Sequence, residues 1–129
     1  MDLLVEVGKP AGDVEAYWPA SQYAFITAWN PASRPTSEAA NQSADSSLVA
    51  QLKAIGAPHQ PAWAEAPSGD WREPGWLVTG LDPHMLDALA HEFGQVAVLH
   101  WEQGRPVRLK MYLPRPTHAS PVAQVDWVE

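Results

Sequence analysis

The sequence predicts an α+β protein, a two-layer sandwich in which two helices cover one face of a mainly antiparallel sheet. Residues 23–29 and 96–101 are apolar at nearly every position, as in strands that are buried on both faces. Two amphipathic helical stretches, 37–55 and 82–93, alternate with strand-like stretches. This β-α-β-β-α-β order, followed by a C-terminal strand, is ferredoxin-like and places strands 23–29 and 96–101 side by side at the centre.

The chain of 129 residues is expected to form one domain with an extension at each end. Residues 1–22 are predicted to be a lead-in segment that contains a short strand at 3–5 and a single helical turn at 14–18. Residues 23–113 make up the α+β domain. The Pro-rich tail, residues 114–129, ends in apolar side chains that can dock on the domain as a last short strand.

Each predicted helix begins at a residue that can cap it. Ser37 precedes the first helix, and Glu38 places a negative charge where a helix N-terminus favours it. Gly56 then ends this helix. Asp82 accepts hydrogen bonds from the first N–H groups of the second helix, and Pro83 supplies a helical φ angle.

The remaining strands are shorter. Residues 61–64 begin with proline and are expected at a sheet edge. Two short segments, 71–73 and 76–79, follow a turn. Residues 102–105 predict a hairpin, and 106–113 return antiparallel to strand 96–101. Basic residues along this returning strand are typical of an edge strand that avoids aggregation.

Composition excludes several classes of function. A net charge of −7 disfavours binding of nucleic acid by the whole surface. The absence of cysteine excludes disulfides and thiolate chemistry. No apolar run approaches the ~18–20 residues of a membrane span, and no leader is recognised, so a cytoplasmic protein without membrane contact is expected. The histidines lack the spacing of metal ligands, and no nucleotide-binding motif is present, so neither a metal nor a cofactor is expected.

Four short strings occur in order along residues 23–101. They are T-A-W-N-P at 27–31, Ser37 with Asn41, G-D-W-R-E at 69–73 before W-L-V at 76–78, and F-G-Q-V-A-V at 93–98. In this order and spacing the chain resembles a bacterial family known only as a domain of unknown function. Members of that family share T-A-(Tyr/Trp)-N-P, S-x-x-E-N, W-x-E-x-S and F-G-Q-x-A strings. The resemblance implies no activity.

Three positions depart from the family pattern. The glutamate before the helix asparagine is Ala40 here, an arginine one turn later is Ala44, and the serine of the third string is Gly75. If the family uses those groups in a site, this chain has lost part of it.

Polar residues within the family strings are the predicted ligand-binding cluster. They lie where strands and helices begin or end, and unpaired backbone groups at such places bind ligands readily. The alternative is that the same side chains brace turns and satisfy buried backbone groups. The cluster comprises Thr27, Asn30, Ser33, Asn41, Glu73 and Gln95.

Two further features carry chemistry. Glu73 lies between Trp71 and Trp76, which can desolvate its carboxylate and fit it for general-base catalysis, although such a glutamate is more often structural. Arg105, Arg108 and Lys110 form a basic strip that can contact an anion or an acidic partner.

The leading hypothesis is a small binding module that recognises a ligand or protein at the strand-end cluster. One alternative is a small enzyme that acts on a nucleotide-like substrate with Glu73 as general base. Another is an interaction protein that forms a homodimer through an edge strand. Whether the protein is an enzyme stays open at this point, because no catalytic pattern is present beyond Glu73.

Overall fold

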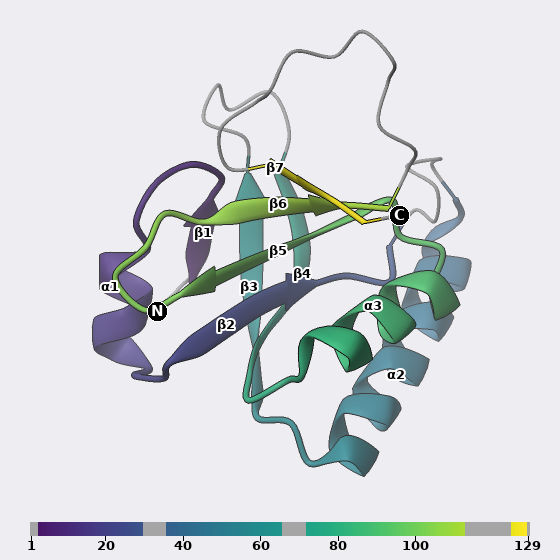
Figure 1. Cartoon of the computed structure of the whole chain (residues 1–129). Coiled ribbons are helices and arrows are strands. Elements are labelled where there is room, and N and C mark those ends of the chain that lie inside the picture. The colour runs from purple at the N-terminus through teal and green to yellow at the C-terminus, as the bar shows by residue number, and fades with distance from the viewer. Residues whose placement is uncertain (1–2, 30–35, 66–71, 113–124, 129) are drawn as a thin grey trace, which may run out of the picture.

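The computed structural model describes residues 3–29, 36–65, 72–112 and 125–128. Figure 1 shows a strongly curled sheet with helices on both sides. In chain order the elements are β1 (Leu4–Glu6), α1 (Gly12–Tyr17), β2 (Gln22–Ile26), α2 (Glu38–Ile55), β3 (His59–Glu65), β4 (Arg72–Thr79), α3 (Pro83–Glu92), β5 (Ala97–Glu102), β6 (Arg108–Met111) and β7 (Val125–Trp127).

The seven strands form one sheet in the order β1-β3-β4-β2-β5-β6-β7. β2 and β5 are neighbours at its centre, with Tyr23 opposite Trp101 and Phe25 opposite Leu99, as their apolar sequences predict. The outermost pairs, β1 with β3 and β6 with β7, are parallel, whereas the inner pairs are antiparallel. The protein is therefore α+β as expected, but the sheet is mixed, so the prediction of a mainly antiparallel sheet is wrong.

The short elements expected at both ends of the chain are present, and the two short strands join the sheet. The lead-in segment contributes β1 and a third helix, α1, and the C-terminal segment contributes β7. A ferredoxin-like order is consequently not confirmed for the sheet as a whole. The physical reason is that the open edges of a sheet present unpaired backbone N–H and C=O groups, and the short segments at both ends of the chain pair with them.

Because of these additional strands, two strands that the sequence placed at the edges of the sheet lie inside it. The segment around 61–64 was expected at an edge, yet β3 pairs with β1 on one side and β4 on the other. β6 likewise lies between β5 and β7. The expected breaks within 71–79 are absent, because β4 runs continuously through Pro74 and Gly75.

Alternating side chains divide the core between the two faces of the sheet. The helical face, formed by Ala24, Ile26, Val78 and Val98, packs on Leu48, Leu52 of α2 and Leu86, Leu89 of α3. On the opposite face Tyr23, Phe25, Leu77, Leu99 and Trp101 pack with Val14 of α1. Period-2 alternation along each strand produces this division, so any strand residue can be assigned to a face from its register.

Both predicted helix starts are confirmed. The Ser37 hydroxyl accepts a hydrogen bond from the backbone N–H of Ala40, and the Asp82 carboxylate accepts one from His84. Gly56 ends α2 with a φ of 80°, a left-handed conformation that glycine adopts without strain. None of the helices in the described part of the chain is long and apolar enough to span a membrane.

Candidate functional site

A pocket of about 470 Å³ lies between the start of α3 and the part of the sheet formed by β2, β5 and β6. This volume falls within the range of small-molecule sites. Its apolar side is formed by side chains of the helical face and of α3, among them Ala24, Val78, Leu81, Pro83 and Leu86. Its polar side comes from β5, β6 and the hairpin between them, and contains His100, Glu102, Arg105, Arg108 and Lys110.

Register explains why these polar groups meet. His100 is opposite Arg108, and Val98 is opposite Lys110, so all three polar side chains lie on the helical face of the sheet. The residues between them, Leu99 and Leu109, turn to the opposite core. Two alternating strands therefore present one histidine and two cations toward the pocket.

The first of these cations is bound to a carboxylate from the edge strand. Nε and Nη2 of Arg108 donate hydrogen bonds of 2.7 Å to the two carboxylate oxygens of Asp126 in β7. Nε2 of His100 lies 2.8 Å from Oδ2 of the same carboxylate. The hydrogen bonds from Arg108 hold the pKa of Asp126 down to about 2, with His100 adding to the effect and partial burial opposing it.

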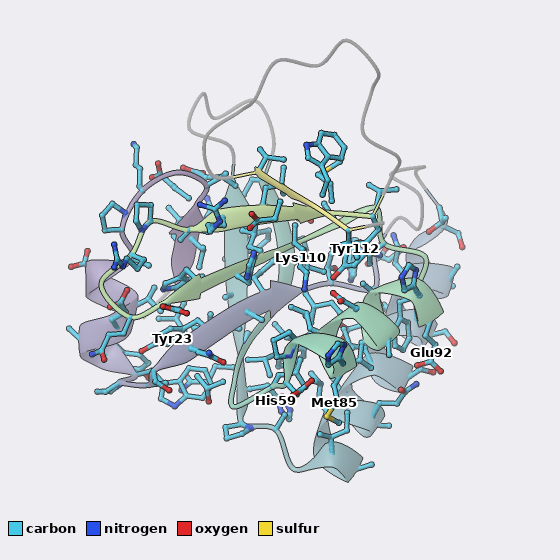
Figure 2. The ribbon with its side chains drawn as sticks, viewed as in Figure 1. Tyr23, His59, Met85, Glu92, Lys110 and Tyr112 are labelled. Atoms are coloured by element: carbon cyan, nitrogen blue, oxygen red, sulfur yellow. The ribbon has the colours of Figure 1, made fainter. Side chains whose placement is uncertain are left out.

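The second cation is bound to α3. Nζ of Lys110 lies 2.7 Å from Oδ1 of Asp87, and the Tyr112 hydroxyl donates a 2.7 Å hydrogen bond to the same oxygen. Figure 2 shows Lys110 and Tyr112 extending between β6 and α3. Burial acts to raise the pKa of Asp87, but the hydrogen bonds from Lys110 and Tyr112 outweigh it, and the pKa is lowered. Burial, together with the Asp87 carboxylate, raises the pKa of Tyr112.

Arg105 is the exposed cation of the pocket. It follows Gly104, whose φ of 80° completes the hairpin turn, and whose N–H donates a 2.8 Å hydrogen bond to Glu15. No carboxylate of the described residues forms an ion pair with Arg105. The three basic residues expected to contact an anion or partner thus all line one pocket.

The predicted strand-end cluster is largely engaged within the protein. Oγ1 of the buried Thr27 accepts a hydrogen bond from the backbone N–H of Trp29. Nε2 of Gln95 donates to the carbonyl oxygen of Trp29 at 3.1 Å. Asn41, which is 3% exposed, accepts a 2.6 Å hydrogen bond from the Thr36 hydroxyl. These contacts join the end of β2 to the turn before β5, and they fix the start of α2.

The other members of the cluster lie elsewhere or cannot be placed. Asn30 and Ser33 lie outside the described residues. Glu73 is opposite Ala64, a member of the core across the sheet from α2 and α3, so it lies on the opposite face from Asn41. The structure therefore brings Thr27 to the backbone N–H of Trp29 and Gln95 to its carbonyl oxygen. Glu73 and Asn41, in contrast, lie on opposite faces of the sheet.

The expected burial of Glu73 does not come from Trp76, which packs on the helical face and donates its indole N–H to Asp45 of α2, and Trp71 lies outside the described residues. Burial raises the pKa of the Glu73 carboxyl group.

Gly75 lies two residues further along β4 and leaves room for the ring of Phe25. That ring would clash with any Cβ at position 75. A serine there, as in the family string, requires that ring to move.

Sequence reasoning missed His100, Asp87 and Asp126 as members of a polar site. His100 appeared isolated because its partners are far away in the sequence, on β6 and β7. A usable signal was present in the alternation: His100, Arg108, Lys110 and Asp126 each have an apolar residue on either side. No three His, Asp or Glu side chains within the described residues gather as a metal site would require.

Comparison with known proteins adds a family but no activity. A family model described as "Protein of unknown function (DUF3293)" matches residues 26–98, which is more than half of the chain. The resemblance noted in the sequence is thereby confirmed. No curated protein and no solved structure matches the chain.

Proposed function

Since the chain belongs to DUF3293, a family of proteins of unknown function, we propose that this member is a binding module for a small ligand with an apolar body and an anionic group. The observation that carries the proposal is the pocket of about 470 Å³ beside α3, which joins apolar and basic sides. A ligand site of this kind combines apolar walls with a few converging polar groups.

The placement of the pocket follows from the sheet. We infer that the strands β3-β4-β2-β5, with α2 and α3 on one face, form a ferredoxin-like unit to which β1, β6 and β7 are additions. β6 extends the sheet beyond the strands that α2 covers, and α3 reaches it through Asp87. The apolar body of a ligand would rest against Leu81 and Leu86, and its anionic group would face the basic side.

Arg105 is the pocket residue best suited to bind the anionic group of the ligand. Arg108 and Lys110 already have carboxylate partners, whereas Arg105 is exposed and forms no ion pair with a described residue. A guanidinium group recognises a carboxylate or phosphate through two parallel hydrogen bonds. Because Asp126 and Asp87 bind Arg108 and Lys110, and Glu102 also lines the pocket, the attraction of an anion depends chiefly on Arg105.

The proposal can be tested with three matched probes: 2-naphthoate, its neutral analogue 2-naphthamide, and acetate, which lacks the apolar body. Titration calorimetry or NMR chemical shifts should show that 2-naphthoate binds at least roughly tenfold more tightly than either of the others, because each lacks one half of the recognised pattern. Native mass spectrometry of gently purified protein would then identify the physiological ligand.

Two variants locate the binding. Arg105→Gln should weaken 2-naphthoate binding several-fold, because charge-assisted hydrogen bonds are lost. Lys53→Gln, at the end of α2 and outside the pocket lining, removes the same charge and should leave binding unchanged. Equal binding of the acid and the amide, or equal effects of the two substitutions, would contradict the proposal.

A second candidate function is favoured by Glu73. Its raised pKa and its place on the sheet face opposite α2 and α3 fit a general base in a small enzyme that acts on a nucleotide-like substrate. Glu73→Gln should abolish any turnover found for such a substrate while leaving 2-naphthoate binding unchanged, because Glu73 is not part of the pocket. Turnover that survives this substitution would exclude Glu73 as the base.

A further inference from the structure

The carboxylate of Asp126 is bound to Arg108 and His100, two residues that line the pocket. Both nitrogens that Arg108 uses, Nε and Nη2, lie 2.7 Å from its oxygens, and His100 lies 2.8 Å from Oδ2. A fork of two N–H groups on two carboxylate oxygens is the usual arrangement by which arginine recognises a free carboxylate. We propose that Asp126 is an internal ligand of this site, which a carboxylate ligand displaces from Arg108 and His100.

The inference rests on the proposed function, because it concerns the same pocket. Arg108 and His100 both line the pocket, yet neither can offer these nitrogens to a ligand while Asp126 holds them. Without displacement, Arg105 is the cation among the described residues lining the pocket that has no ion pair to give up for the ligand's anionic group. With displacement, the anionic group of the ligand gains the guanidinium group of Arg108 and the ring of His100 as partners.

β7 is the element best suited to be displaced. It has three residues, lies at the edge of the sheet, and pairs only with β6 among the described strands. One further backbone hydrogen bond, from Val128 to Met111, extends this contact. The side chain of Asp126 is 36% exposed. Short edge segments with few buried contacts open locally at a small free-energy cost, without unfolding of the rest.

The other carboxylate of the site provides a contrast. Asp87 belongs to α3, whose Leu86 and Leu89 are buried in the core beneath the helices. It is held by both Lys110 and Tyr112. Displacing Asp87 would require α3 to leave the core, whereas displacing Asp126 requires only a three-residue strand to leave an edge. The exchangeable partner is therefore Asp126, and the edge of β6 becomes available when ligand binds.

Competition for Arg108 makes the proposal quantitative. If ligand and Asp126 compete for Arg108, the apparent affinity is reduced by the fraction of molecules in which Arg108 is free, so removal of the Asp126 charge must strengthen ligand binding by the inverse of that fraction. A merely positioning role for Asp126, in which it holds Arg108 and His100 in place for the ligand, predicts the opposite change. The sign of the effect thus separates the two roles.

The test measures 2-naphthoate binding to the full chain and to three variants. Asp126→Asn should bind roughly tenfold more tightly than the unaltered protein. Asp13→Asn removes the same charge from the exposed part of α1 and should leave the affinity unchanged. The double variant Asp126→Asn with Arg108→Gln should lose the gain, because the freed guanidinium is absent.

A second readout follows β7 directly in the unaltered protein. The indole N–H signal of Trp127, assigned in NMR spectra with Trp127→Phe, should move on addition of 2-naphthoate toward its position in Asp126→Asn. Circular dichroism would verify that Asp126→Asn keeps the fold of the remaining strands.

The outcomes distinguish the inference from the proposed function. Unaltered affinity or weaker binding in Asp126→Asn, with binding to the parent protein intact, overturns the inference alone. Binding to Asp126→Asn but not to the parent supports the inference and shows that β7 closes the site. Absence of binding to both overturns the inference together with the proposed function.

Discussion

The ring of Phe25 in β2 occupies the space where Gly75 of β4 would carry a side chain. A Cβ added at Gly75 would collide with this ring and would lie 2.9 Å from the carbonyl oxygen of Ile26. Real Cβ atoms essentially never approach backbone that closely, so the two central strands are matched to each other at this point. Glycine at position 75 is what allows phenylalanine at position 25 to fill this space.

This relationship predicts a large cost for a small substitution. Gly75→Ala should lower the free energy of unfolding by about 1–3 kcal/mol, because overpacking forces Phe25 or the backbone to move. Gly12→Ala is the matched control: no heavy atom lies within 4 Å of its added Cβ, and it lies in α1. That control should be neutral or stabilising by about 0.4–1 kcal/mol. Urea denaturation of both variants checks the prediction, and equal stabilities would contradict it.

Burial of Glu73 predicts a specific dependence of stability on pH. Its pKa is raised in the folded protein, so ionisation is harder there than in the unfolded chain. The contribution of Glu73 to stability is therefore full below its ordinary pKa of 4.5 and is lost as the pH rises through the raised folded value. Glu73→Gln should be more stable than the parent at pH 7, and this advantage should vanish below about pH 4.

Chemical denaturation at several pH values measures this difference. Glu102→Gln, at the exposed end of β5, serves as a control for the loss of one negative charge. A Glu73→Gln variant whose stability runs parallel to the parent's at every pH would show that burial does not govern Glu73.

Replacing Gln95 tests whether the strand-end cluster stabilises the fold or binds a ligand. Gln95→Ala should lower the free energy of unfolding by about 1 kcal/mol, because the carbonyl oxygen of Trp29 loses its 3.1 Å donor. Binding of 2-naphthoate should not change, since Gln95 does not line the pocket. The exposed Gln42→Ala should stay within about 0.5 kcal/mol of the parent. Loss of ligand with unchanged stability would return the ligand site to the strand-end cluster.

Because β2 lies at the centre of the sheet, truncation of one of its buried side chains should strongly lower the free energy of unfolding. Ile26 is 0% exposed and packs in the core beneath α2 and α3. Ile26→Ala should cost about 2–5 kcal/mol through lost burial and the cavity that remains. The exposed Gln22→Ala on the same strand should have little effect on the midpoint of denaturation. A cost below about 1 kcal/mol for Ile26→Ala would contradict the placement of this side chain in the core, because the lost transfer free energy remains even when the cavity closes.

Local chemistry by itself determined much of the protein. The caps at Ser37 and Asp82 and the stop at Gly56 depend on hydrogen bonds and φ angles within a few residues, so they can be recognised without the fold. The apolar runs of β2 and β5 likewise predicted their central, adjacent positions, because only strands buried on both faces need such sequences.

Only the tertiary structure decided which segments close the sheet and which polar groups meet. The sequence predicted short strands near both ends of the chain, but a strand of three residues carries no signal for its partner, and only the structure shows that β1 pairs with β3 and β7 with β6. The same pairing brings Asp126 to His100 and Arg108 across gaps of 26 and 18 residues. A sequence records that these side chains alternate with apolar ones, but the register between strands decides that they share one carboxylate. Register arises from the packing of the whole sheet, and for that reason the site emerged only with the fold.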